Sequence, residues 1–350
     1  MRLQSLLIKY TGLFLFSLFL FSGCTPSDSD KSAPKGNAVY YWRTSFSLSE
    51  PEQKFLKENS ITTIYVKFFD IVASASGLRP ESTLIFKQPF PKDIEIVPTV
   101  FIDSKSLSAE NAPENLADLI VSRVDTMMSK NGYPLAPELQ IDFDWAQSNR
   151  TTYFSLLQQI ANILHSHGRT LSTTIRLHQL SQTPPPADYG TLMLYNTGNF
   201  SSPVERNSIL STKAIKPYLK YLKGYSLPLA TALPIYSWDL LFRHDHFVVI
   251  ARGLNHQDTT QFAPVTHNLY RARKYGALPG SANENGTGAR ILPGDILRHE
   301  EVSYELLDSV ASIIKEIRPG ALQRVILYHL DQKSLSNYNS NDIKEIYNYR

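Results

Sequence analysis

The sequence alternates between segments typical of buried β-strands and segments typical of amphipathic helices, and this alternation restricts the possible folds most. Eight strands are predicted, at residues 38–46, 62–72, 94–103, 139–145, 170–180, 190–198, 228–238 and 324–332. Helices are predicted between most of them, at residues 50–59, 109–130, 152–168, 204–222 and 304–318. Eight strands separated by helices predict an α/β fold of the (β/α)8 TIM-barrel type. The alternative is an open doubly wound sheet, but no glycine-rich phosphate loop follows any predicted strand.

The predicted barrel occupies residues 38–332. Residues 239–300 do not continue its pattern and are predicted to be a long insertion after the seventh strand. Residues 82–90 are predicted to form a small hairpin arm, and the polar residues 333–350, rich in Tyr and Asn, a C-terminal surface tail.

The N-terminus has the pattern of a bacterial export signal. Arg2 and Lys9 precede an uncharged apolar run at 13–21, which is shorter than the roughly 20 residues that span a membrane. The run is followed by Ser-Gly-Cys24, which resembles a lipobox although Phe occupies the position where Leu is usual. The resemblance implies that residues 1–23 are a lipoprotein signal peptide and that Cys24 is acylated. The alternative is an ordinary signal peptide with an incidental cysteine.

Lipidation explains the lone cysteine of an exported chain, because Cys24 has no partner for a disulfide bond. Two or more acyl chains anchor a protein stably to a membrane. Residues 24–37 are rich in Ser, Pro, Asp and Lys and are predicted to be a flexible tether. Their Ser-Asp-Ser-Asp segment resembles the export signal of surface lipoproteins. We therefore expect a location in the cell envelope, lipid-anchored to the outer membrane, with display at the cell surface and placement at the periplasmic face as the two alternatives.

Charge and composition exclude some partners. The formal charge is +3, and it falls to +1 without residues 1–23, which carry two cations and no anions. Lys and Arg are not clustered as nucleic-acid binding requires, so we expect no nucleic-acid partner. The chain has 19 Tyr, 17 Phe and 3 Trp, which suits stacking against sugars. We expect no cofactor.

The fourth predicted strand carries two carboxylates on one face. Alternate residues of a strand share a face. The face that we expect to pack against the helices is apolar, with Leu139, Ile141, Phe143 and Trp145. The face that we expect to point into the barrel carries Gln140, Asp142, Asp144 and Ala146. Because barrel enzymes place catalytic groups at the C-terminal ends of strands, Asp142 and Asp144 are predicted to mark an active or binding face.

Three short motifs resemble family 18 of the glycoside hydrolases, which contains chitinases and endo-N-acetylglucosaminidases. Residues 141–145, Ile-Asp-Phe-Asp-Trp, match the centre of that family's Asp-Gly-x-Asp-x-Asp-x-Glu motif. Residues 193–196, Met-Leu-Tyr-Asn, are similar to its Met-x-Tyr-Asp, and residues 234–236, Pro-Ile-Tyr, to its Pro-x-Tyr. The insertion lies where the family often carries an extra domain. The chain is also similar to a group of exported bacterial barrels with Gln-Ile-Asp-x-Asp on this strand, which implies no particular activity.

The resemblance implies a catalytic mechanism, but the sequence departs from it. In the family, a Glu protonates the leaving oxygen while the substrate's acetamido group attacks, and an Asp equivalent to Asp144 steadies that group. The Glu position is Ala146 here, the first Asp is Leu139, and the Asp of the sixth strand is Asn196. The usual chemistry is therefore expected to be lost or to use a different acid.

Other carboxylates are candidates for that acid. Two carboxyl groups suffice for glycoside hydrolysis, and Asp142 and Asp144 are on the order of 7 Å apart by strand rise. Asp331, at the end of the eighth strand, is a more distant candidate partner. Three further acids, which are more often caps or loop hydrogen-bond acceptors, lie at or just after strand ends: Asp70, Asp103 and Asp239.

Each candidate also has a structural interpretation. Arg176 or Arg43 can neutralise Asp142 through a charge-assisted hydrogen bond. His178 is predicted to share a strand face with Arg176, as a proton carrier or as a satisfied polar residue. The candidates for substrate binding are Tyr195, Asn196, Tyr236, Trp238, Arg176 and His178. The alternative for the aromatic residues is packing at the barrel rim.

We expect no metal site. His244-Asp245-His246 is the strongest local pattern, with two histidines predicted on one strand face, but it lacks a distant third ligand. Pro293-Gly294-Asp295 with Arg298 and Glu300 is predicted to shape the return to the last helix.

Three interpretations are compatible with these features. One is a membrane-anchored glycosidase-like enzyme that acts on glycans, with Asp144 central. Another is a catalytically inactive glycan-binding or scaffold lipoprotein, which the replacement of the acid Glu by Ala146 favours. A third is a structural lipoprotein without a ligand.

The lipid anchor is testable at Cys24. The Cys24→Ser variant should lose labelled fatty acid and move from the membrane fraction to the soluble fraction of lysed cells, because the acyl chains provide the attachment. Ser29→Ala, in the tether, is the control and should keep both. A soluble, unlabelled wild type would show that the segment is an ordinary signal peptide.

Overall fold

The structure is a computed structural model that describes residues 33–108, 112–251, 253–278 and 290–349. Within these ranges, no helix has the length and apolar character needed to cross a membrane. The predicted signal peptide, Cys24 and most of the predicted tether lie outside the described residues.

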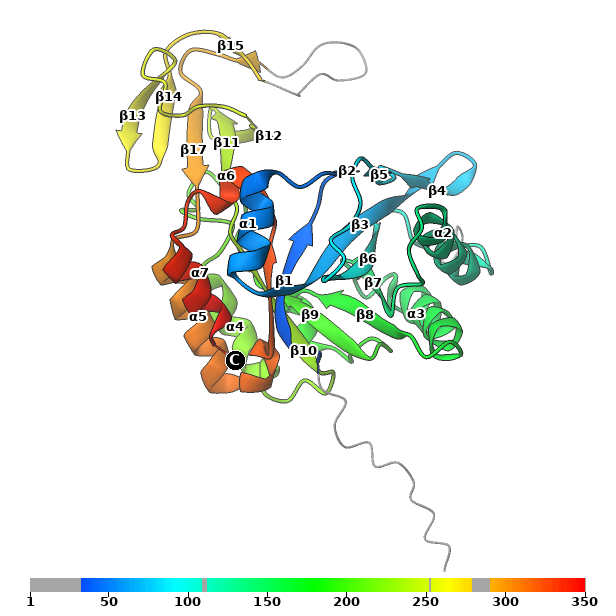
Figure 1. Ribbon diagram of the computed structural model, residues 1–350. Coiled ribbons are helices and arrows are strands. Elements are labelled where there is room, and N and C mark those ends of the chain that lie inside the picture. Colours follow the sequence, from blue (N-terminus) through cyan, green and yellow to red (C-terminus); the bar gives the residue numbers. More distant parts are fainter. Residues whose placement is uncertain (1–32, 109–111, 252, 279–289, 350) are drawn as a thin grey trace, which may run out of the picture. The chain divides into compact units, whose positions relative to one another are not determined.

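Eight parallel strands close into a barrel (Figure 1). They are β1 (Gly36–Tyr41), β3 (Ile61–Ser74), β6 (Glu95–Ile102), β7 (Glu138–Phe143), β8 (Thr170–Ile175), β9 (Tyr189–Met193), β10 (Leu229–Pro234) and β18 (Arg324–Tyr328). Each pairs with the next one along the chain, and β1 pairs with both β18 and β3, which closes the ring. The predicted (β/α)8 TIM barrel is confirmed.

Five longer helices lie outside the barrel strands: α1 (Glu50–Glu58), α2 (Leu116–Lys130), α3 (Arg150–His165), α4 (Thr212–Leu222) and α5 (Tyr304–Ile317). Their apolar faces pack in one large core with the outward side chains of the strands, including Leu139, Ile141, Phe143 and Trp145. Helix α1 begins after Ser49, whose backbone N–H donates a hydrogen bond to the Glu52 carboxylate at 2.8 Å. Helix α4 begins later than predicted, at Thr212, where the Ser211 side chain accepts a hydrogen bond from the backbone of Ala214.

Residues 239–300 contain a second sheet, which is antiparallel. Its strands, in spatial order, are β12 (His246–Ile250), β11 (Trp238–Arg243), β17 (Ile296–Glu300), β14 (Leu269–Ala272) and β13 (Phe262–Thr266). A small pair is formed by β15 (Gly276–Ala277) and β16 (Arg290–Ile291). The sheet buries its own apolar cluster, which includes Leu241, Phe262 and Leu297. It therefore has a separate core, although it begins directly after barrel strand β10.

The structure differs from the sequence predictions in several short segments. The hairpin arm predicted at 82–90 is wrong, because β5 (Ile85–Phe86) pairs with β2 (Ser45–Phe46), while β4 (Gly77–Glu81) forms the hairpin with β3. Strand β8 ends at Ile175 and is followed by the 3-10 helix η1 (Leu177–Ser181). A second 3-10 helix, η2 (Pro319–Leu322), precedes β18.

The predicted C-terminal surface tail packs against the barrel. It contains α6 (Gln332–Leu335) and α7 (Ser340–Tyr347). Ile343, Ile346 and Tyr347 are buried, and the Tyr347 hydroxyl donates a hydrogen bond to the backbone oxygen of Ala38 in β1. Apolar residues spaced three and four apart make α7 amphipathic, which the polar composition of the segment conceals.

The lumen of the barrel is polar on the β7 side. Gln140 is fully buried, and its amide oxygen accepts hydrogen bonds from Tyr40 at 2.7 Å and Thr99 at 3.4 Å. Its amide nitrogen donates to Ser172 at 3.4 Å and Thr191 at 3.2 Å. The Gln140 side chain therefore connects β7 with β1, β6, β8 and β9. These hydrogen bonds satisfy polar groups that would be costly to bury alone.

Glu138 lies one layer below Gln140 and is also buried. One carboxylate oxygen accepts hydrogen bonds from Ser172 and Tyr189, and the other lies 4.0 Å from Arg324. Burial raises the pKa of Glu138 from 4.5 to about 7, although these two hydrogen bonds and the charge of Arg324 act in the opposite direction.

This raised pKa predicts a loss of stability with rising pH. The protonated Glu138 is favoured in the folded state, so its contribution is full below about pH 4.5 and is lost as the pH rises through about 7. At about 1.4 kcal/mol per pKa unit, the contribution is on the order of 3 kcal/mol. Glu138→Gln should therefore gain stability relative to the wild type between pH 4.5 and pH 8, as measured by urea unfolding. Glu316→Gln, on the exposed face of α5, is the control, and an equal pH trend in both variants would contradict the prediction.

Candidate functional site

The two predicted carboxylates at the end of β7 have different surroundings. Asp142 is buried, and its Oδ1 accepts hydrogen bonds from Thr174 at 2.6 Å and Arg176 at 2.9 Å. Asp144 is half-exposed, and its Oδ1 lies 3.6 Å from Nε2 of His178 and 3.5 Å from the amide nitrogen of Gln179. Asp142 is therefore held in a neutralised lumen network, whereas Asp144 is accessible to a ligand.

The residues after β8 provide both partners. Because β8 ends at Ile175, Arg176 and His178 do not share a strand face as predicted. Arg176 precedes η1 and reaches down to Asp142, while His178 lies in η1 beside Asp144. The alternative partner for Asp142, Arg43, instead donates from Nη2 to both carboxylate oxygens of the buried Glu52, at 3.0 and 2.9 Å.

A cavity of about 560 Å³ opens at the C-terminal ends of β1, β9, β10 and β18. Aromatic side chains that line it are Trp42, Tyr236, Trp238 and Tyr328. Their rings contact one another at centroid distances of 5.6 to 5.9 Å. We call these four residues the mouth aromatic cluster. Trp42 and Tyr328 were not among the predicted binding residues, because both lie in the middle of predicted strands that end earlier in the structure, at Tyr41 and Tyr328.

Tyr195 and Asn196, the other predicted binding residues on this side, support the cluster. Tyr195 stacks on Tyr328 with the ring centroids 4.6 Å apart. Asn196 lines the cavity and accepts a hydrogen bond from the Tyr236 hydroxyl at 2.6 Å. Its φ of 53° lies in the left-handed region that asparagine tolerates better than most residues. The Asn196 side chain is thereby turned toward the end of β10.

Burial keeps two of the mouth hydroxyls neutral. Burial and the neighbouring Tyr328 raise the pKa of Tyr195 well above its usual range. Burial, followed by Tyr328 and Glu300, raises the pKa of Tyr236 in the same way. Both side chains therefore keep an O–H group that can donate a hydrogen bond at any physiological pH.

Trp238 is positioned from the insertion. Its indole nitrogen donates to Oε2 of Glu300 at 2.8 Å, and the same oxygen accepts hydrogen bonds from the backbone and side chain of Ser208. Glu300 is buried and its charge is paired with Arg298 at 2.7 Å. Arg298 also donates to backbone oxygens of Phe200 and Ser202. Arg298 and Glu300 therefore fix the loop after β9 as well as Trp238, beyond the predicted return to the last helix.

The remaining predicted acids have local structural partners. Asp331 lines the cavity, but its side chain caps α6 by accepting hydrogen bonds from the backbones of Lys333 and Ser334. Asp70 is paired with Lys67 at 2.9 Å. Asp103 accepts from the backbone of Lys105 and the side chain of Ser106. Asp239 belongs to a different group of side chains, described below.

The position of the family's acid Glu carries no proton donor. Ala146 is exposed in the turn before α3, where its backbone N–H donates to Asn149. The ionisable group that the structure places beside Asp144 is the imidazole of His178. His244 and Asp245 form the turn between β11 and β12 with positive φ, so the predicted strand face for His244 and His246 is wrong.

The fold is similar to solved chitinases and cortex-lytic enzymes. The spore cortex-lytic enzyme SleL of Bacillus cereus has a TM-score of 0.53 and 14% identity, over 89% of this chain and 73% of that chain. A chitinase of Chromobacterium violaceum has a TM-score of 0.52 and 14% identity, over 91% and 100%. A group IV chitinase of Ostrinia furnacalis in complex with allosamidin has a TM-score of 0.51 and 10% identity, over 90% and 98%. No protein-family model and no curated protein matches the sequence.

At these identities the likeness shows the barrel fold, as the family 18 motifs predicted, and the chemistry has to be argued from the site.

Proposed function

We propose that this protein binds a glycan at the C-terminal mouth of its barrel. The observation that carries the proposal is the cavity of about 560 Å³ lined by the mouth aromatic cluster and Asn196. Aromatic faces bury the apolar C–H surface of sugar rings, and amide and hydroxyl groups satisfy sugar hydroxyls. Active sites of TIM barrels also lie at this end of the strands.

The similar structures agree with this ligand class. The Ostrinia furnacalis enzyme is a chitinase, and its structure contains allosamidin. The other two are a chitinase and a spore cortex-lytic enzyme. We therefore expect glycans that contain N-acetylglucosamine to be the first class to test.

Binding without the usual hydrolysis is the interpretation that the residues favour. Family 18 chemistry needs a carboxylic acid at the position of Ala146, where the described turn has only a methyl group. Asn196 replaces a second family carboxylate and is engaged by Tyr236. Asp142, the buried member of the Asp142 and Asp144 pair, is neutralised by Arg176. General acid catalysis requires an acid within hydrogen-bond reach of the leaving oxygen.

One observation favours hydrolysis as a second candidate function. His178 lies 3.6 Å from Asp144, and a carboxylate beside an imidazole is a pair that can transfer a proton. In this alternative, Asp144 stabilises the developing positive charge and His178 supplies the proton. Asp144 is not among the residues that line the aromatic cavity, so a glycan that used both regions would have to extend across the mouth.

We further propose that the barrel works at a membrane surface in the cell envelope, anchored through Cys24. The first barrel strand begins at Gly36, so only a short segment separates the acylated residue from the fold. This proposal is supported by the lipobox-like sequence and is tested by the Cys24→Ser variant.

Binding is tested at Trp238. Trp238→Ala should weaken binding of chito-oligosaccharides about fivefold in calorimetric titrations, because it removes a ring whose contacts contribute roughly 1 kcal/mol. Tyr275→Ala, which removes an exposed aromatic side chain of the insertion, is the matched control and should bind as the wild type does. Equal affinities for all three proteins, or no binding of any glycan tested, would contradict the proposal.

Hydrolysis is tested at Asp144. The wild type, Asp144→Asn and His178→Gln are incubated with N-acetylglucosamine-containing and plain glycans, and products are separated by chromatography. We expect no product from any of them, because Ala146 cannot donate a proton. Asp103→Asn is the control. If the wild type and this control release product and the two other variants do not, hydrolysis is the function instead of binding alone.

A further inference from the structure

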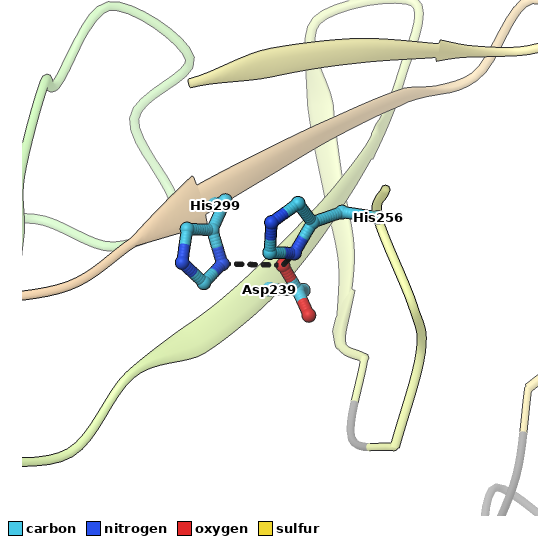
Figure 2. A group of neighbouring side chains, drawn as sticks. All are labelled: Asp239, His256 and His299. Carbon is cyan, nitrogen blue, oxygen red and sulfur yellow. Dashed lines mark hydrogen bonds and ion pairs between the residues drawn. The ribbon is translucent and has the colours of Figure 1, made fainter. Parts of the chain in front are cut away.

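Three side chains from distant segments meet at the base of the insertion sheet (Figure 2). Asp239 is on β11, His256 follows β12 in a loop, and His299 is on β17. Nδ1 of His299 lies 2.8 Å from Oδ1 of Asp239, and Nδ1 of His256 lies 3.3 Å from the same oxygen. The imidazole rings face each other with centroids 3.9 Å apart. All three side chains are largely withdrawn from solvent.

We propose that Asp239, His256 and His299 form a binding site for a divalent transition-metal ion of the Zn²⁺ type. Two imidazole nitrogens and one carboxylate oxygen are ligands that Zn²⁺ binds at about 2.0–2.2 Å, and three protein ligands leave one position open. Tetrahedral geometry at those bond lengths places ligand atoms roughly 3.3–3.5 Å apart. One ligand atom from each residue lies within 4.8 Å of the others, so small side-chain rotations close the site.

A fourth residue orients one of the ligands. Nε2 of His299 lies 3.5 Å from a carboxylate oxygen of Glu301. Metal-binding histidines generally direct the second ring nitrogen to a carboxylate or a carbonyl, which fixes the tautomer and the ring orientation. With Glu301 on Nε2, the Nδ1 atom of His299 is the one turned toward Asp239 and is available to a cation. With a cation on Nδ1, Glu301 and His299 would form two members of a carboxylate–histidine–metal triad.

The open side of the site faces a cavity of about 610 Å³. Besides His256 and His299, its lining includes Asn207, Asn268, Tyr270 and Lys333. A water or a small ligand has room to occupy the open position of the metal ion. The ammonium group of Lys333 in the same cavity favours a ligand with an anionic group. The proposed metal site is distinct from the glycan cavity, although its ligand Asp239 follows Trp238 directly and lines the glycan cavity.

The alternative is that Asp239 accepts ordinary hydrogen bonds from two imidazoles and binds no metal. Direct titration with Zn²⁺ distinguishes the two. The protein is the full chain in nonionic detergent, with Cys24→Ser to remove the one thiol, after dialysis against a chelator. We expect calorimetry to show one Zn²⁺ per chain and the melting temperature to rise with Zn²⁺ concentration, because a ligand of the folded state stabilises it.

Variants assign the site. Asp239→Asn and His256→Gln should each remove the binding, and Glu301→Gln should weaken it about 10- to 100-fold. His246→Gln, which changes an exposed histidine of the neighbouring hairpin, is the matched control and should bind as the parent chain does. His256 lies in a loop, so its variant should fold even if Asp239→Asn does not, and circular dichroism verifies folding.

Binding with Co²⁺ gives a second readout. Co²⁺ in the site should show the intense visible absorption of a four-coordinate ion, which His256→Gln should abolish. Absence of Zn²⁺ binding in the parent chain, or binding that survives in the folded His256→Gln variant, would overturn the proposal and leave a hydrogen-bonded triad.

Discussion

The fold depends on how the barrel satisfies the polar side chains that β7 points into its lumen. Glu138, Gln140 and Asp142 occupy three successive lumen positions of one strand, and all three are buried. Each finds partners on neighbouring strands, which repays the cost of removing polar groups from water. A slip of one residue would turn Ile141 and Phe143 into this polar interior. The hydrogen bonds therefore fix the register of the sheet as well as its closure.

The insertion helps to build the mouth of the barrel. Glu300 and Arg298 come from the insertion sheet, yet they hold Trp238 and the loop that follows β9. Both are buried, and a buried ion pair is stable only when its remaining hydrogen-bonding capacity is used. The Trp238 indole and backbone groups of the loop after β9 form those remaining hydrogen bonds. Loss of the insertion would consequently remove the hydrogen bond that positions Trp238 in the aromatic cavity.

The chain shares its barrel fold with solved chitinases, and its sequence departs from the family 18 motif at Ala146 and Asn196. The TM-scores near 0.5 extend over about nine-tenths of the chain, so the likeness includes the whole architecture. Ala146 and Asn196 nevertheless replace family carboxylates. A barrel is a scaffold whose function resides in the residues at its strand ends. The mouth aromatic cluster is the feature on which the proposed glycan binding rests, and Asp144 beside His178 is the one on which the second candidate function rests.

The sequence alone determined the fold class and the face on which the carboxylates lie, because periodicities of two and of about 3.6 residues report which side chains are buried. It also placed Tyr236, Trp238 and Asn196 at the mouth. Only the tertiary structure showed that Asp142 pairs with Arg176 and that Asp144 lies beside His178. The reason is that β8 ends earlier than its sequence pattern predicted, so Arg176 and His178 do not share a strand face. It alone brought Asp239, His256 and His299 together from a strand, a loop and another strand. Local patterns do not encode such contacts, because antiparallel pairing of β11 with β17 joins residues about sixty positions apart.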